Sequence, residues 1–235
     1  GDLERAARYH EKLGQPVAQA HYLVGMAQRA FAQGDSHTGK KLLAKSLKVY
    51  PGSVEAWLTS MERAMADGAW NRVADLLRQA LTQVAPQLRF VLLEGLMQPA
   101  APTSRAESCP TLDPAVCQAL LAVIEEHETD LLLHYYGAWM AIRARDLDKG
   151  VIWLRRTLEI KADFWPARLD LLALSREEQS LTPTFQAQLD FFVDTARQVK
   201  RFFCRQCGIK RERLFFVCPR CQSWHSIGFR TVLQE

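Results

Sequence analysis

The stretch AHYLVGMAQRAFAQGDSHTGKKLLAKSLKVYP, residues 20–51, decides the fold because its pattern returns in the stretch that follows it. That second stretch, VEAWLTSMERAMADGAWNRVADLLRQALTQVAP, covers residues 54–86. Each has a helical first half, a break at Gly34 or Gly68, a helical second half and a proline at its end. Small and apolar residues recur 34 positions apart, at Ala27 and Met61, Ala30 and Ala64, and Leu43 and Leu77. The chain therefore contains a repeated helix pair.

A third unit follows further along the chain, LLLHYYGAWMAIRARDLDKGVIWLRRTLEIKA at residues 131–162. Gly137, Ala138 and Ala141 are small where two helices must cross closely. A period of 34 residues with small residues at helix crossings is typical of tetratricopeptide repeats. Stacked repeats of this kind form a superhelix whose concave side binds partners. The predicted fold is therefore mostly α, with a tetratricopeptide-repeat superhelix as its main part.

Further helices are expected around these units. The segment between Leu88 and Asp130 is a stretched unit with an enlarged loop at residues 98–114, which is rich in proline and serine. We expect helices over residues 86–97, from Pro114 to about Glu128, from about Pro166, and from Pro183, the last two capping the stack. The final helix has an apolar face that includes Phe192 and Val193. Residues 2–13 are typical of the last helix of a preceding repeat, so a longer parent protein is expected.

The composition is that of a globular protein. Hydrophobic residues make up 48% of the 235 residues and charged residues 24%, which argues against disorder. Of 30 basic and 26 acidic residues, nine basic and two acidic ones lie from Arg197 onwards, which leaves 21 and 24 before it. The body is therefore slightly acidic and the tail basic. No signal peptide and no apolar run of membrane-spanning length is visible.

The helical part shows no pattern of catalytic residues. It has no Gly-rich phosphate loop, no G-x-S-x-G motif and no H-E-x-x-H motif. Its histidines are scattered without metal-ligand spacing, which favours surface or packing roles. Tryptophans fall where helix pairs pack, which predicts core positions, although some can instead line a groove as anchors for a peptide. They are Trp57, Trp70, Trp139, Trp153 and Trp165.

The chemistry lies in CRQCGIKRERLFFVCPRC, residues 204–221. It contains two C-x-x-C pairs, and each pair is typical of a metal-binding turn. Two such turns bring four sulfurs to the corners of a tetrahedron about 2.3 Å from a metal. The predicted metal ligands are Cys204, Cys207, Cys218 and Cys221. Close cysteine pairs indicate metal in a reducing compartment rather than disulfides, and Cys109 and Cys117 are expected to be ordinary thiols.

A small β domain is expected to carry these cysteines. Residues 212–217 and 223–229 are expected to be strands, and His225 is not expected to be a ligand because four cysteines complete the shell. The predicted division is 1–200 for the repeats with capping helices and 201–235 for a rubredoxin-like or zinc-ribbon domain. So short a domain builds little apolar core, so the metal supplies most of its folding free energy. Four-sulfur sites take zinc or iron, and redox-silent zinc is favoured.

Basic and aromatic residues are interleaved around the cysteines. The basic residues are Lys200, Arg201, Arg205, Lys210, Arg211, Arg213, Arg220 and Arg230, and the aromatic ones Phe202, Phe203, Phe215, Phe216, Trp224 and Phe229. Zinc ribbons bind nucleic acid with such surfaces. The alternative is that the aromatic residues bury the ribbon against the last helices, while the charges face solvent, an acidic neighbour or anionic lipid. We favour packing over nucleic acid.

The repeats together with RFFCRQCG and CPRCQSW, in this order, resemble the cytoplasmic region of the lipopolysaccharide assembly protein B family. These are bacterial tetratricopeptide-repeat proteins with a rubredoxin-like C-terminal domain. The resemblance covers essentially the whole chain. It implies an N-terminal membrane anchor, a place on the cytoplasmic face of the inner membrane, and metal binding at the four cysteines. It implies partners as well: the membrane-bound AAA+ metalloprotease, the lipid A-committing deacetylase and lipopolysaccharide assembly proteins.

The interpretation is a non-enzymatic adaptor or scaffold that limits lipopolysaccharide synthesis by promoting proteolysis of the deacetylase. Two alternatives belong to other classes. One is a rubredoxin-type electron-transfer or redox-sensing protein, which requires iron in the four-cysteine site. The other is a nucleic-acid-binding zinc ribbon on a repeat scaffold.

Overall fold

The computed structural model describes residues 1–97, 113–178 and 181–232. These residues are mostly helical, and a three-stranded antiparallel sheet with a cluster of four cysteines follows the helices, as the sequence predicts. The chain forms two compact units, Gly1–Cys109 with Gln222–His225, and Pro110–Cys221 with Ser226–Glu235. The predicted domain boundary between residues 200 and 201 stays a prediction.

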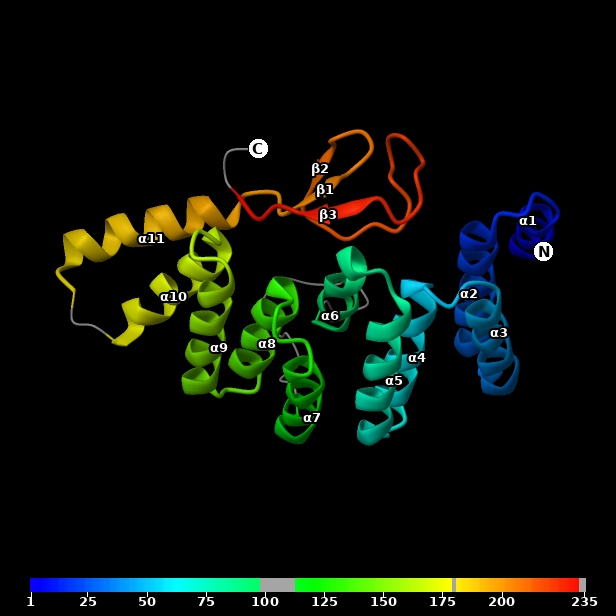
Figure 1. Cartoon of the computed structure of the whole chain (residues 1–235), viewed down its shortest axis with the longest axis horizontal. Helices are drawn as coiled ribbons and strands as arrows, with labels where there is room; N and C mark the ends of the chain where they lie inside the picture. The colour runs from blue at the N-terminus through cyan, green and yellow to red at the C-terminus, as the bar shows by residue number, and fades with distance from the viewer. Residues whose placement is uncertain (98–112, 179–180, 233–235) are drawn as a thin grey trace. The chain divides into compact units, whose positions relative to one another are not determined.

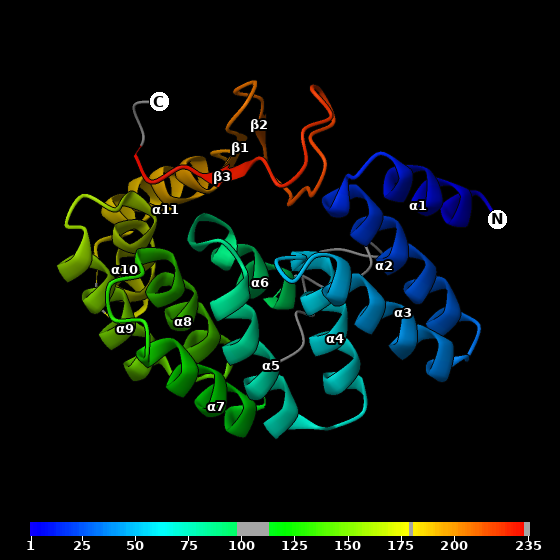
Figure 2. The ribbon, with the colours of Figure 1, turned by 45° about the vertical axis from the view of Figure 1, so that its right-hand side comes forward.

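The first unit is built from helix pairs (Figures 1 and 2). α2 packs against α3, and α4 packs against α5 and α6. The elements are α1 (Asp2–Lys12), α2 (Pro16–Ala32), α3 (Ser36–Val49), α4 (Val54–Ala66), α5 (Trp70–Gln83), the 3-10 turn η1 (Pro86–Leu88) and α6 (Arg89–Met97).

The correspondence at 34 residues is visible in this unit. Gly34 and Gly68 follow the first helix of each pair with φ of +82° and +68°, a conformation that glycine adopts without steric cost. Equivalent positions on the helices are buried in both pairs, among them Ala27 and Met61, and Leu43 and Leu77. The predicted helical repeat is therefore present in the packing as well as in the sequence.

The second unit holds the remaining helices and the sheet. α8 packs against α7 and α9, and α10 packs against α9 and α11. Aspartates begin three of the helices, where the carboxylates of Asp113, Asp130 and Asp146 accept hydrogen bonds from amides of the first turn. The elements are α7 (Pro114–Glu125), α8 (Leu131–Arg143), α9 (Leu147–Ile160), α10 (Trp165–Glu178), α11 (Pro183–Arg197), β1 (Phe202–Cys204), β2 (Lys210–Arg211) and β3 (Ile227–Phe229).

The sheet differs from the predicted strands. Its order is β2-β1-β3, with Phe202 opposite Arg211 on one side and opposite Phe229 on the other. The prediction of a strand at residues 212–217 is wrong, and the predicted strand at residues 223–229 is reduced to β3. Residues 214–217 are all half-buried, so they lack the alternation of buried and exposed side chains that a strand on a sheet face shows.

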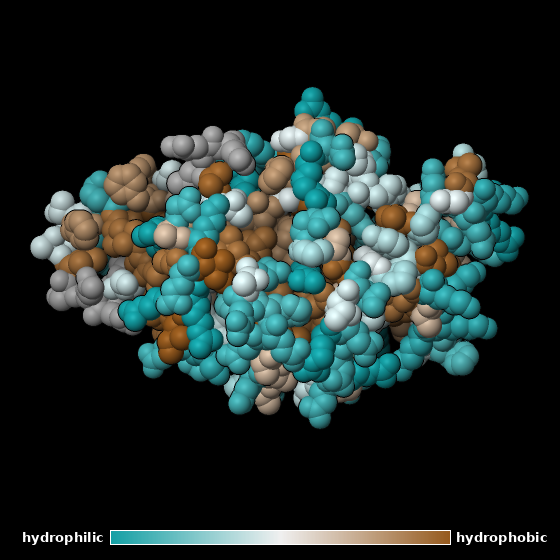
Figure 3. Space-filling view, in the orientation of Figure 1, coloured by the Kyte–Doolittle hydropathy of each residue, from teal (hydrophilic) through white to brown (hydrophobic). Residues whose placement is uncertain are grey.

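Some aromatic side chains lie outside the core. Trp70 is 38% exposed, so its predicted core position is wrong. It is the first residue of α5 and lies at the end of the helix pair rather than along its contact face. Val193 of α11 is buried, but Phe185, Phe191 and Phe192 are each more than half exposed. Hydrophobic surface is visible over α10 and α11 in Figure 3.

The predicted loop at residues 98–114 lies outside the described residues except for Asp113 and Pro114, which begin α7 as expected. Cys109 also lies outside them, whereas Cys117 is a buried free thiol. Among the described residues, no helix has the length and apolar character needed to cross a membrane.

Candidate metal centre

The four predicted cysteines come together in the second unit. One ligand atom from each of Cys204, Cys207, Cys218 and Cys221 lies within 4.8 Å of the others. The Sγ atoms of Cys204 and Cys221 are 3.6 Å apart, as are those of Cys207 and Cys218. Sulfurs at 2.3 Å from a central metal are separated by about 3.8 Å in a tetrahedron. The spacing and the donor set therefore fit one metal ion.

The first C-x-x-C turn is shaped by its backbone. The amide of Gly208 donates to the carbonyl of Cys204 at 2.8 Å, and the amide of Cys204 donates to the carbonyl of Ile209 at 2.9 Å. Gly208 has φ of +71°, as expected for a residue that closes such a turn. The amide of Gln206 donates to the Cys204 sulfur at 3.4 Å, which stabilises a thiolate there.

Ser226 is a polar neighbour of the sulfurs that the sequence did not reveal. Its hydroxyl is buried and forms a hydrogen bond with the Cys204 sulfur, with the two atoms 3.2 Å apart. Burial raises the pKa of the Cys204 thiol, but hydrogen bonds from Ser226 and from the amides of Cys207 and Gln206 outweigh it and lower that pKa to about 6.

The pKa of the Cys207 thiol is shifted in the opposite direction, upwards. A hydrogen bond from the amide of Ile209 lowers its pKa, but burial and the three neighbouring thiols together raise that pKa to about 11. Four thiols so close together resist simultaneous ionisation, because each added negative charge repels the last. A bound cation removes this penalty, so metal binding and thiol ionisation are coupled.

The residues directly after the last cysteine pack in the first unit. The Glu55 carboxylate is only 5% exposed, and one oxygen lies 3.2 Å from Nδ1 of His21 while the other lies 2.9 Å from Nε2 of His225. The Trp224 ring has its centroid 4.9 Å from that of His21 and 6.3 Å from that of Tyr22. The segment Gln222–His225 is thus held by a buried carboxylate and an aromatic contact.

Glu55 keeps its charge in this setting. Burial raises the pKa of the Glu55 carboxyl, but hydrogen bonds from His21 and His225 and the charge of His225 outweigh burial and lower that pKa to about 2. A buried carboxylate needs such partners, because an unpaired one would cost several kcal/mol.

The residues after this segment pack on helices of the second unit. Phe229 of β3 is 7% exposed, and its ring centroid lies 6.1 Å from those of Tyr135 and Phe164 and 5.8 Å from that of Phe202. Trp165 Nε1 donates to the carbonyl of Arg230 at 3.2 Å. For Phe202 and Phe229, the expected burial of ribbon aromatics against helices is present.

Six of the basic residues near the cysteines are exposed: Lys200, Arg205, Lys210, Arg211, Arg213 and Arg220. Exposed basic side chains are expected both on a surface that contacts only solvent and on a surface that binds a partner. The preference for an acidic or membrane-side neighbour over nucleic acid therefore stays a prediction.

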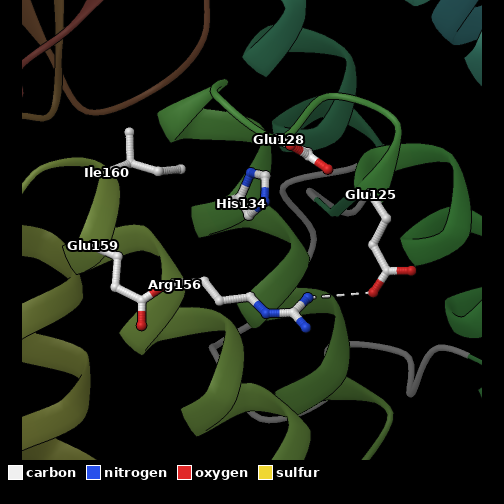
Figure 4. Close-up of a pocket in the computed structure, with 6 residues that line it drawn as sticks. All are labelled: Glu125, Glu128, His134, Arg156, Glu159 and Ile160. Carbon is white, nitrogen blue, oxygen red and sulfur yellow. Dashed lines mark hydrogen bonds and ion pairs between the residues drawn. The ribbon is translucent and has the colours of Figure 1, made fainter.

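A wide acidic hollow of about 640 Å³ is a second candidate site in the second unit (Figure 4). It is lined by Glu125, Glu128, His134, Arg156, Glu159 and Ile160. Arg156 reaches towards Glu125 and pairs with it at 3.3 Å (Figure 4). His134 is buried, and its Nδ1 lies 3.1 Å from the carbonyl oxygen of Asp130. The described lining of this hollow has no serine, cysteine or lysine that could act as a nucleophile. We interpret it as a solvated acidic surface.

No protein-family model matches the chain, and a search of curated proteins finds no match. The assignment of the metal centre therefore rests on its geometry and on the chemistry of its thiols.

Proposed function

We propose that the chain is a non-enzymatic adaptor of the tetratricopeptide-repeat type with a structural zinc ion near its C-terminal end. Its helix pairs bind a client protein. In keeping with the family resemblance, it promotes proteolysis of the lipid A-committing deacetylase by the membrane-bound AAA+ metalloprotease and so limits lipopolysaccharide synthesis. It works with lipopolysaccharide assembly proteins at the cytoplasmic face of the bacterial inner membrane.

The observation that carries the adaptor proposal is the packing on both sides of the four cysteines. His225, four residues after Cys221, bonds to buried Glu55 of the first unit. Phe229 packs with Tyr135 in the second unit. A metal centre in such a segment supports helices and their binding surfaces. Four thiolates also fill a tetrahedral shell, which leaves no position for a substrate.

Zinc is the metal that suits a purely structural role. It has no redox chemistry and accepts four thiolates in a tetrahedron. The three short strands supply little apolar core of their own, so the metal contributes much of the free energy that folds them.

A rubredoxin-type electron carrier is the second candidate, and one observation favours it. Cys221 is exposed and Cys207 half-buried, so two of the sulfurs lie where an electron can pass to a partner. This candidate needs iron.

Metal content separates the two candidates. Protein purified without added metal is measured by elemental analysis and visible absorption. The adaptor proposal expects one zinc ion per chain and no colour. One iron ion with thiolate charge-transfer bands would instead favour electron transfer.

The adaptor role is tested by the lifetime of the deacetylase in bacterial cells that carry the full-length protein. Cys204→Ser should abolish metal binding and lengthen the deacetylase half-life several-fold. Cys117→Ser is the matched control, because Cys117 is a buried thiol on α7 outside the cluster, and it should leave the half-life unchanged. An unchanged half-life in a Cys204→Ser protein that has lost its metal contradicts the proposal.

A further inference from the structure

A small hollow of about 210 Å³ lies among α8, α10 and α11 of the second unit. Tyr135, Trp139 and Trp165 give it aromatic sides, and Leu169 and Ala196 add apolar ones. Sites for drug-sized ligands have volumes of about 300–1,000 Å³, so this hollow is smaller. It corresponds to about seven water molecules at their volume in the liquid. Its size therefore suits one large side chain.

Hydrogen bonds fix the aromatic sides of the hollow. Asp170 is 8% exposed, and its Oδ2 accepts hydrogen bonds from the Tyr135 hydroxyl at 2.9 Å and from Trp139 Nε1 at 3.0 Å. Trp165 Nε1 donates to the carbonyl of Arg230. With these polar atoms engaged, the rings present mainly apolar surface to a ligand. The hollow is preformed, so binding costs little conformational entropy.

Two arginines place positive charge beside the hollow. Arg197 and Arg201 line it, and they also line a second hollow of about 420 Å³ that includes Glu212. Arg197 is exposed, and its side chain makes no hydrogen bond or ion pair to any residue that the structure describes. Burial raises the pKa of Asp170 to about 6, although its two hydrogen bonds and the charges of Arg201 and Arg197 act against burial. Arg197 thus brings a positive charge to the rim of the first hollow, where the Asp170 carboxylate already accepts hydrogen bonds from two donors.

We propose that this hollow binds one bulky apolar side chain of a client polypeptide, and that an acidic residue beside it pairs with Arg197. Stacking on the aromatic sides stabilises the apolar group. Guanidinium groups hold a carboxylate through charge-assisted, bidentate hydrogen bonds. A basic residue at the same place is rejected by like charge.

A polypeptide is the occupant that fits both hollows. The first takes a single side chain, while the second shares the two arginines and has room for neighbouring residues of an extended chain. The identity of the client rests on the proposed adaptor function, but binding at the hollow can be measured without it.

The first test measures peptide binding to the whole chain by calorimetry. The probe is a peptide with blocked ends that contains Glu-Phe-Glu between glycines, and the controls contain Glu-Ala-Glu or Lys-Phe-Lys. The Glu-Phe-Glu peptide should bind saturably. Each control peptide should bind at least about tenfold more weakly than the Glu-Phe-Glu peptide. This loss is expected when a buried aromatic anchor or a charge-assisted hydrogen bond is removed.

Two variants locate the binding. Ala196→Phe fills the hollow, and Arg197→Glu reverses the charge of an exposed side chain that makes no hydrogen bond to any described residue. Both should weaken binding of the Glu-Phe-Glu peptide about tenfold or more. Arg155→Glu, the same charge change at an exposed position of α9, should leave binding unchanged. The proposal is overturned by absent binding at millimolar peptide, by equal binding of the Lys-Phe-Lys peptide, or by normal binding to both variants.

The deacetylase half-life separates failure of this inference from failure of the proposed function. If the half-life depends on Cys204 but no peptide binds, the adaptor role stands and the pocket is overturned. If the peptide binds at the hollow but Arg197→Glu leaves the half-life unchanged, the pocket stands and its use for this client is overturned.

Discussion

At the scale of single residues, Glu55 has the most demanding position. Its carboxylate is buried and lies between His21 and His225, which come from far apart in the sequence. Tyr50 is its other titratable neighbour, and burial followed by the Glu55 charge raises the pKa of that phenol. Tyr50 therefore stays neutral at acidic pH, whereas the Glu55 carboxylate is protonated as pH falls towards 2.

Replacement of Glu55 should give a stability change that depends on pH. The pKa of Glu55 falls from 4.5 to about 2 on folding, so its stabilising effect is present above about pH 4.5 and disappears as pH falls towards 2. Glu55→Gln should lower the free energy of unfolding at pH 7 by at most about 3 kcal/mol. Urea unfolding at pH 7, 5 and 3 measures how this difference shrinks.

Glu62→Gln is the control for this prediction, because Glu62 is on the same helix, α4, and burial raises the pKa of its carboxyl instead of lowering it. Removal of the Glu62 charge should therefore not lower the free energy of unfolding at any of the three values of pH. A Glu55→Gln effect that is equally large at pH 3 and pH 7 would mean that the charge of Glu55 does not hold the segment in place.

The residues of the metal cluster could be predicted from the sequence, whereas the Glu55 contacts could not. The four cysteines lie within 18 residues and have a spacing that only a few kinds of site use. Glu55 and His225 are 170 residues apart and belong to common residue types, so no local pattern marks them. The contact of Ser226 with the Cys204 sulfur was not predicted either, because serine is a common residue type and no local pattern marks it.

At the scale of elements, close helix crossings depend on single small residues. A Cβ atom on Gly137 of α8 would lie 2.6 Å from Cε3 of the Trp153 ring and 3.2 Å from a Leu121 methyl carbon. Trp153 is 2% exposed, so its ring has nowhere to move. The small residue that the repeat pattern predicted at this crossing is therefore required by the packing of α8 against α9.

Gly137→Ala should destabilise the protein by about 1–3 kcal/mol, because it overpacks this crossing. Gly25→Ala on α2 is the matched control, because its Cβ would meet only the flexible end of Leu3 at 3.3 Å. The better helix propensity of alanine should make that variant neutral or more stable by about 1 kcal/mol. Urea unfolding of both variants checks the difference, and equal effects would contradict this account of the crossing.

Helices were predicted well from the sequence and strands poorly, for a physical reason. Helix pairs such as α2 and α3 repeat an apolar pattern over many turns and are bounded by glycine or capping residues. The strands have only two or three residues each, too few for alternation to be visible. Their positions are set by the turns at the cysteines and by pairing across the sheet. β1 is one example: it was missed because it directly follows the helical region.

At the scale of the whole molecule, the cysteines and the segment after them belong to different compact units. The cysteines are part of the second unit, whereas Gln222–His225 is part of the first. Loss of the metal should therefore speed hydrogen exchange in residues of both units. A site that only folded a separate ribbon would change hydrogen exchange in that ribbon alone.

Removal of the metal with a chelator should speed amide hydrogen exchange about a hundredfold or more in β1 and β3, because the metal supplies much of their stability. Exchange should also quicken in α4 around Glu55, because His225 loses its fixed position. Mass spectrometry of peptic fragments can follow both regions. Cys117→Ser should behave like the unaltered protein, and a response limited to the cysteine segment would contradict this prediction.

The contact between Glu55 and His225 also sets an order of events during synthesis on the ribosome. Glu55 and His225 are separated by 170 positions, so Glu55 is synthesised well before its partner His225 exists. At about 5–20 residues per second, that wait lasts about 10–30 s. Throughout it, the first helix pairs can form from their local contacts, but Glu55 lacks one of its two partners. The contacts of Glu55 therefore form in two stages, and the helices around it stay accessible to chaperones and proteases until His225 has been made and has left the ribosome.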